Sequence, residues 1–160
     1  MIRLAILTIS DGVSAGTREN RSGPAIDHWA TGRTDVQVTA RAVVPDEVPQ
    51  IAAQLIAWAD GDVANLVVTT GGTGLGPRDV TPEATRTVLE RDIPGIPEAL
   101  RAAGRATVTT APLGRGIAGT RRGTLIVNLP GSVAAVRDGL QVLDPLLEHA
   151  VQLLAGHTEH

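Results

Sequence analysis

Apolar residues follow two alternating patterns along the chain. Continuous or alternating apolar runs of strand length lie at residues 4–9, 36–44, 66–70 and 125–128. Apolar residues recur with helical spacing over residues 22–29, 48–58, 82–91, 93–105 and 132–154. The pattern also predicts a strand at 107–113, followed by a basic connection or hairpin end at 114–123. Strands and helices therefore alternate.

This alternation predicts an α/β fold. Parallel neighbouring strands need crossover connections, and right-handed helical crossovers place helices on both faces of the sheet. We therefore expect a three-layer α/β/α sandwich with a mostly parallel central sheet. The 160 residues, 42% of them hydrophobic, fit one domain over residues 1–160. Because Phe and Tyr are absent and Trp occurs only twice, the core has to be aliphatic.

Charge and composition argue against several classes of protein. A net charge of −3 and the scarcity of aromatic side chains disfavour a general nucleic-acid binder. Without cysteine there is no disulfide and no thiolate zinc site. The first residues run into a strand pattern instead of a signal peptide, and no apolar run approaches the roughly 20 residues that span a bilayer. We expect a cytoplasmic protein with no nucleic-acid or membrane partner.

The most informative segment is residues 69–84, which read Thr-Thr-Gly-Gly-Thr-Gly-Leu-Gly-Pro-Arg-Asp-Val-Thr-Pro-Glu-Ala. Its glycines allow positive φ and a close approach of the backbone to an anion. Thr81 is the predicted N-cap of the next helix, with Pro82 as its first residue. Arg78 and the loop amides can face phosphate oxygens, while Asp79 offers a hard oxygen ligand to a divalent cation.

A simpler interpretation of the same segment is a tight strand-to-helix turn in which Asp79 only bonds to nearby amides. Two known phosphate motifs are excluded. A P-loop needs a lysine, and all fourteen basic residues of this chain are arginine. The dinucleotide-binding fingerprint needs a small residue where Pro77 stands. The loop is therefore of a different type.

Polar residues also follow three other predicted strands, in the segments 10–12, 45–47 and 128–132. In open parallel sheets, ligands bind beyond the carboxyl ends of the strands. We therefore expect these segments to converge with the glycine loop and to place several acidic residues around one anion site.

Five motifs, taken together and in order, resemble the Mog/MoaB family of molybdenum cofactor biosynthesis. They are Ile-Ser-Asp at 9–11, Pro-Asp-Glu at 45–47, Thr-Thr-Gly-Gly-Thr-Gly at 69–74, Pro-Arg-Asp-Val-Thr-Pro-Glu-Ala at 77–84 and Asn-Leu-Pro-Gly-Ser at 128–132. The resemblance covers essentially the whole chain. It implies a molybdopterin-binding fold and, for the Mog branch, transfer of AMP from Mg-ATP to the terminal phosphate of molybdopterin with release of pyrophosphate.

The resemblance also implies site residues and partners. Asp46 and Asp79 match the two acids needed for catalysis and would organise Mg²⁺ and the triphosphate. The glycine loop would supply the phosphate cradle, and residues of two other loops would line the nucleotide and pterin pockets. The cradle comprises Gly71, Gly72, Thr73 and Gly74, and the pocket residues are Ser10, Asp11, Pro130, Gly131 and Ser132. A homotrimer is implied, with the molybdenum-insertion enzyme of the same pathway as a possible partner.

Alternatives stand beside these roles. Asp46 suits a helix cap, Asp11 a turn, and Ser132 an N-cap whose helix amides can still face a phosphate. A MoaB-type protein would bind molybdopterin without turnover. Two metal-organising acids, Asp46 and Asp79, favour the enzyme, because binding alone does not require them. A phosphate-ester hydrolase with Asp79 as base is a third possibility, but no second motif supplies its water-activating partner.

Overall fold

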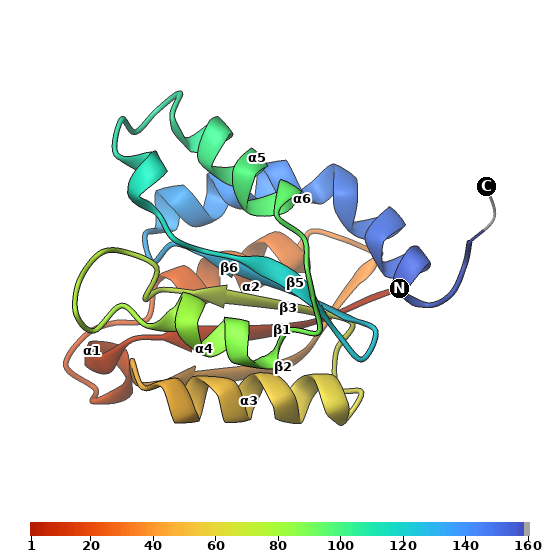
Figure 1. Ribbon diagram of the computed structural model, residues 1–160, viewed down its shortest axis with the longest axis horizontal. Helices are drawn as coiled ribbons and strands as arrows, with labels where there is room; N and C mark the ends of the chain where they lie inside the picture. Colours follow the sequence, from red (N-terminus) through yellow and green to blue (C-terminus); the bar gives the residue numbers. More distant parts are fainter. Residues whose placement is uncertain (159–160) are drawn as a thin grey trace.

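The computed structural model describes residues 1–158, so the last two residues of the predicted domain, 159–160, lie outside the described part. Six strands form one sheet in the order β2-β1-β3-β6-β5-β4 (Figure 1). They are β1 (Ile2–Ile9), β2 (Val36–Val44), β3 (Leu66–Thr70), β4 (Arg91–Asp92), β5 (Ala118–Arg121) and β6 (Thr124–Leu129). The first four strands in this order are parallel, and β5 runs antiparallel to both of its neighbours, β6 and β4. The prediction of a mostly parallel sheet is confirmed.

Helices cover both faces of the sheet. They are α1 (Asp11–Ser14), α2 (Ser22–Thr31), α3 (Val48–Asp60), α4 (Thr81–Val88), α5 (Gly95–Gly104) and α6 (Val133–Leu154), with one 3-10 turn, η1 (Ala111–Leu113). One hydrophobic cluster joins the sheet to α2, α5 and α6, and a second joins the opposite face to α3 and α4. The predicted three-layer α/β/α arrangement is therefore confirmed (Figure 1).

Strand β1 shows how the sequence builds this core. Leu4 and Ile6 belong to the cluster on the α2, α5 and α6 side, whereas Ala5 and Leu7 belong to the α3 and α4 side. Successive side chains of a strand point to opposite faces, so a strand covered on both faces needs a continuous apolar run. This explains the apolar run of β1 and those of β3 and β6.

The prediction of a strand at residues 107–113 is wrong. Its backbone instead continues from the end of α5 in tight turns: the amides of Thr107 and Val108 donate to the carbonyl of Gly104 at 3.2 and 2.9 Å. The segment ends in η1, in which Pro112 has no N–H to offer a neighbouring strand. Local hydrogen bonds therefore replace those that a sheet would have provided.

The helix predicted at 82–91 ends earlier, at Val88, because Leu89 is extended (φ −69°, ψ 136°). The chain then joins the sheet as β4, which pairs with β5. For the predicted basic connection or hairpin end at 114–123, the structure shows the hairpin. Strand β5 returns as β6 through Arg122 and Gly123, both at positive φ (50° and 80°), as two-residue hairpin turns require.

Parallel pairing places four strand ends at one edge of the sheet. The strands β2, β1, β3 and β6 end at Val44, Ile9, Thr70 and Leu129. The amide of Ser10 donates to the carbonyl of Val44 at 3.0 Å, which holds two of these ends together. Within residues 1–158, no helix is long and apolar enough to cross a membrane.

Candidate functional site

The loops that follow these four strand ends surround a cavity of about 660 Å³. The predicted residues that line it are Ser10, Asp46, Gly71, Gly72, Asp79, Gly131 and Ser132. They come from four separate segments of the sequence, so the expected convergence at the carboxyl edge is found. Figure 1 shows the loop after β1 entering α1 and the loop after β3 entering α4.

The other predicted residues, Asp11, Thr73, Gly74 and Pro130, do not line the cavity. They hold its walls in place. The carbonyl of Pro130 accepts a hydrogen bond from the hydroxyl of Thr70 at 2.7 Å. The carbonyl of Thr73 accepts from the amide of Arg115 at 2.9 Å. These residues therefore act on the cavity through the loops that they fix.

Gly71 and Gly72 form the sharp turn at the end of β3. Both have positive φ, +101° and +69°. A Cβ on Gly71 would lie 2.2 Å from the carbonyl oxygen of Ile9, and one on Gly72 would lie 2.3 Å from the hydroxyl of Thr81. The turn therefore needs glycine for its backbone conformation and also for its close contacts.

Thr81 is not the N-cap of α4, as the sequence predicted. Val80 occupies that position without a side-chain capping bond, and Thr81 begins the helix. Its hydroxyl is buried and donates to the carbonyl of Gly71 at 2.8 Å, while its amide donates to the carbonyl of Gly72 at 3.1 Å. Thr81 therefore ties the helix to the glycine turn.

Asp46 is half-buried in the cavity wall. Its Oδ2 accepts a hydrogen bond from the amide of Asp11 at 2.8 Å, so the alternative role as a helix cap is wrong; Glu47 holds the N-cap position of α3. Burial raises the pKa of Asp46, and the nearby carboxylates of Asp11 and Asp79 raise it further. Asp46 is therefore an acid with an increased affinity for a proton.

Asp79 lines the same cavity, and its Oδ2 accepts from the amide of Gly76 at 2.9 Å. The simpler interpretation, a bond to a nearby amide, is therefore correct for one oxygen. That bond also fixes the direction of the carboxylate. Because Asp79 raises the pKa of Asp46, the two acids are close enough to interact electrostatically.

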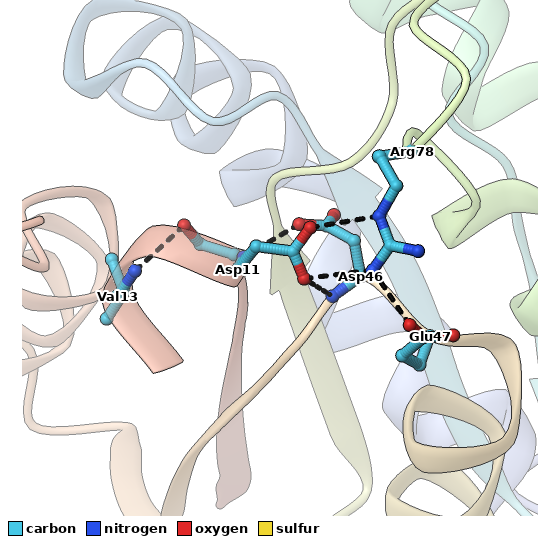
Figure 2. A network of polar contacts seen from close by, with 6 residues as sticks. Asp11, Val13, Asp46, Glu47 and Arg78 are labelled. Carbon is cyan, nitrogen blue, oxygen red and sulfur yellow. Dashed lines mark hydrogen bonds and ion pairs between the residues drawn. The ribbon is translucent and has the colours of Figure 1, made fainter. Parts of the chain in front are cut away.

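Arg78 does not face the cavity with the loop amides, as the sequence suggested. Its guanidinium binds both carboxylate oxygens of Asp11, at 3.1 and 3.2 Å, and Oε1 of Glu47 at 2.8 Å (Figure 2). This arginine lowers the pKa of Asp11, and the two carboxylates raise the pKa of Arg78. Arg78 thus joins the glycine loop to the ends of β1 and β2.

Arg115 holds the glycine loop from the other side. Its Nε donates to the carbonyl of Gly74 at 2.8 Å, and a terminal nitrogen donates to the carbonyl of Asp79 at 2.7 Å. The second terminal nitrogen pairs with Glu83 in the first turn of α4 and lowers its pKa. The loop is therefore tied to β5's entry segment and to α4.

Two serines begin helices at the cavity. The hydroxyl of Ser10 accepts from the amide of Val13, and that of Ser132 accepts from the amide of Ala135, both at 3.2 Å. The predicted N-cap role of Ser132 is confirmed. Because Ser132 and Val133 line the cavity, the N-terminal end of the long helix α6 lies at its wall.

The segment after α1 forms a further wall of the cavity that was not predicted from the sequence. Its lining residues are Arg18, Glu19, Asn20, Arg21 and Ser22. The sequence did contain a signal for it: a long polar stretch follows the buried strand β1, and such a stretch at the carboxyl edge of a sheet is available to a ligand. The segment adds Arg18, Glu19 and Arg21 to the lining, and Arg21 pairs with Glu19 at 3.0 Å. The wall thus brings positive charge next to the carboxylates of Asp46 and Asp79, as a ligand with both metal and phosphate would need.

The carboxylates fit Mg²⁺ in kind. Mg²⁺ prefers hard oxygen ligands and usually binds one or two carboxylates together with water and phosphate oxygens. Asp46 and Asp79 provide two such side chains, and a Cβ on Gly72 would fill the space 3.0 Å from Oδ1 of Asp46. Within residues 1–158 no group of three or more His, Cys, Asp or Glu side chains is arranged to hold a metal alone. Nucleotide oxygens would have to complete the site.

The sequence is similar to those of several known proteins. A relative from Synechococcus elongatus, named molybdenum cofactor biosynthesis bifunctional protein, is 42% identical over 94% of this chain and 47% of its own length. The chain thus spans about half the length of the bifunctional relatives that it matches. The molybdopterin adenylyltransferase of Helicobacter pylori is 38% identical over 98% of this chain and 89% of its own length.

The fold is shared with a solved structure as well. The molybdopterin biosynthesis enzyme MoaB from Thermus thermophilus is 45% identical, with a TM-score of 0.91 over 98% of both chains. The family model described as "Probable molybdopterin binding domain" matches residues 5–149. The chain therefore belongs to the Mog/MoaB family of molybdenum cofactor biosynthesis proteins.

Proposed function

We propose that this chain is a molybdopterin adenylyltransferase, which transfers AMP from Mg-ATP to the terminal phosphate of molybdopterin and releases pyrophosphate. The observation that carries the proposal is the meeting of Asp46, Asp79 and the Gly71–Gly72 turn in one cavity. Two carboxylates beside a backbone able to approach an anion closely are what a metal-bound triphosphate requires.

In this reaction, an oxygen of the molybdopterin phosphate attacks the α-phosphorus of ATP. The bond from that phosphorus to the oxygen shared with the β-phosphate breaks, and pyrophosphate leaves with the bonding electrons. Such a transfer depends on alignment and charge neutralisation, without a covalent enzyme intermediate. Bound Mg²⁺ would supply neutralisation of the phosphate charge.

The residues of the cavity divide these tasks. Asp46 and Asp79 hold the metal-bound nucleotide at a fixed place. The Gly71–Gly72 turn lets the phosphates approach the backbone closely. Arg18 lines the wall formed by residues 18–22 and provides positive charge for phosphate oxygens, to which Arg21, paired with Glu19, adds. The Helicobacter relative, which bears the adenylyltransferase name, supports the proposed activity, because this chain matches 89% of its length.

A second candidate is a protein that binds molybdopterin without turnover. The similarity to the MoaB structure from Thermus thermophilus, at 45% identity, is as high as the similarity to the named adenylyltransferases, so this candidate stands beside the first. Both candidates predict pterin binding, so only transfer distinguishes them.

The decisive experiment is a single-turnover assay with purified protein, molybdopterin, Mg²⁺ and α-labelled ATP. We expect label on the pterin with the wild type and none with Asp46→Asn or Asp79→Asn. The matched control is Asp62→Asn, because Asp62 pairs with Arg3 at the opposite edge of the sheet. Pterin binding without label transfer would assign the chain to the noncatalytic branch.

A further inference from the structure

Arg78 is the residue immediately before Asp79, yet it does not line the cavity. Its side chain crosses from the glycine loop to two other loops and ends between Asp11 and Glu47 (Figure 2). An arginine can do this because its planar guanidinium presents donors in several directions at fixed angles. A lysine, with a single nitrogen, could not reach the same set of oxygens with this geometry.

Asp11 links Arg78 to Asp46, which lines the cavity. The carboxylate oxygen Oδ1 that Arg78 binds also accepts a hydrogen bond from the amide of Asp46 at 3.0 Å. In return, Oδ2 of Asp46 accepts from the amide of Asp11 at 2.8 Å. The pair of aspartates therefore fixes both the backbone and the carboxylate of Asp46.

We propose that Arg78 is a positioning residue that sets the place of Asp46 relative to Asp79 and so determines the affinity for metal-bound nucleotide. Arg78 is joined to Asp79 by one peptide bond and to Asp46 through Asp11. A single side chain thereby connects both acids without occupying the cavity. This inference rests on the proposed function for the nature of the ligand.

Electrostatics agrees with the geometry. Three carboxylates, those of Asp11, Asp46 and Asp79, lie in this region, and like charges resist being brought together. The guanidinium of Arg78 binds Asp11 and Glu47, so its positive charge lies beside these carboxylates and offsets part of their repulsion. The ion pair therefore helps to keep Asp11 where it can accept the hydrogen bond from the amide of Asp46.

The competing explanation is that Arg78 contacts a phosphate directly. The two explanations differ in whether the contribution of Arg78 to ATP binding depends on Mg²⁺. A phosphate contact would contribute whether or not Mg²⁺ is present. Positioning of Asp46 would contribute only to the metal-bound complex. It would also make Arg78 and Asp11 act as one unit, so that removing both would cost no more than removing either.

The test measures binding of ATP by calorimetry, with Mg²⁺ and with EDTA, for Arg78→Met, Arg78→Lys, Asp11→Asn and the Arg78→Met/Asp11→Asn double variant. The control is Glu47→Gln, which removes the negative charge of the other partner of Arg78 and leaves the Asp11–Asp46 pair intact. Because exposed ion pairs contribute little to stability, all variants are expected to fold, which circular dichroism checks.

We expect Arg78→Met and Asp11→Asn each to weaken Mg-ATP binding by about tenfold, with a double variant no weaker than either. Arg78→Lys should not restore the affinity, and Glu47→Gln should change it by less than about threefold. Binding of ATP in EDTA should be unchanged. An equal loss in EDTA would make Arg78 a phosphate ligand, and additive effects would disconnect it from Asp11; either result overturns the proposal.

A second readout separates this inference from the proposed function. In the ligand-free protein, the amides of Asp11 and Asp46 are hydrogen-bonded to each other's carboxylates. We expect their hydrogen exchange to become faster in Arg78→Met and to stay unchanged in Glu47→Gln. Unchanged exchange in Arg78→Met would refute positioning even if wild-type protein binds Mg-ATP. Faster exchange in a protein that does not bind Mg-ATP would refute the proposed ligand and leave the positioning contact standing.

Discussion

Gly72 faces Asp46 so closely that a Cβ on this glycine would lie 3.0 Å from the carboxylate oxygen Oδ1. The same Cβ would lie 2.3 Å from the hydroxyl of Thr81, which holds the start of α4. The space beside the acid therefore exists only because residue 72 has no side chain. A larger residue at position 72 would therefore displace Asp46, one of the two acids proposed to hold the metal-bound nucleotide.

Gly72→Ala should therefore remove Mg-ATP binding and destabilise the fold together. The alanine would have to adopt a positive φ and displace both Asp46 and Thr81, which costs about 1–3 kcal/mol. Calorimetric binding and urea unfolding measure the two effects. Gly156→Ala is the control, since Gly156 also has a positive φ (+88°) but has nothing within 4 Å of a Cβ. Binding by Gly72→Ala with wild-type affinity would contradict the role of this space.

Asp46→Asn should stabilise the protein near neutral pH. Burial raises the pKa of Asp46 above the usual 3.8, so the folded chain binds this proton more tightly than the unfolded chain. Stability contributed by the neutral carboxyl is then lost as the pH rises from 3.8 through the raised value. Asparagine keeps an acceptor for the amide of Asp11 and carries no charge. Melting temperatures at several pH values should show a gain that shrinks towards acidic pH.

Asp11→Asn provides the opposite case. Arg78 lowers the pKa of Asp11, so its contribution to stability is present above 3.8 and is lost as the pH falls through the lowered folded value. The variant should melt at a lower temperature than the wild type near neutral pH. Shifts of the same sign for the two aspartates would contradict the assignment of burial as the main influence on Asp46.

Arg115→Met should loosen the glycine loop. The variant loses the bonds to the carbonyls of Gly74 and Asp79, and methionine keeps most of the apolar stem. We expect faster hydrogen exchange at the amide of Gly76, whose bond to Asp79 depends on the loop geometry. Arg121→Met is the matched control, because Arg121 binds Asp60 and the carbonyl of Val88 away from the cavity. Equal changes at Gly76 in both variants would argue against a local effect.

Asn128→Ala should lower stability by about 3 kcal/mol without altering nucleotide affinity in the folded fraction. Asn128 is 3% exposed, and its amide group donates to the hydroxyls of Thr69 and Thr85, both at 3.0 Å. Its Oδ1 accepts from the amide of Ile117 at 3.1 Å. Urea unfolding should show a smaller loss, about 1 kcal/mol, for Thr85→Val, which leaves the bond to Thr69 in place. Similar losses for both variants would show that the bonds of Asn128 to Thr69 and Ile117 add little to stability beyond its bond to Thr85.

Elements covered on both faces could be predicted from the sequence. The strands β1, β3 and β6 are continuous apolar runs, because each side chain meets a helix layer. Strand β4 could not be found in this way: Arg91 and Asp92 are exposed and carry no apolar pattern. Strand β5 lies within the segment 114–123, which was predicted only as a basic connection or hairpin end. Its four residues are too few to show a strand pattern beside the basic turn at Arg122 and Gly123.

The candidate site was predicted as far as loops can be placed at a sheet edge. The glycine turn, Asp46 and Asp79 follow from that placement and from the family resemblance. The partners of the arginines do not, because Arg78 meets Asp11 across 67 positions of sequence. Spacing along the chain says nothing about such a contact, and only the order of the strands brings the two residues together.

The order of the strands couples ligand binding to folding, because it builds the cavity from distant parts of the chain. The residues that line the cavity are spread from Thr8 to Val133, so no short segment of the chain contains them all. A ligand that needs the whole wall can bind only the native sheet and not a partly folded chain. Binding and global folding are therefore one linked equilibrium, in which a ligand at about 100 times its Kd would add about 2.7 kcal/mol to the free energy of unfolding. The heat stability of this protein thus becomes a direct measure of how much of its cavity is filled.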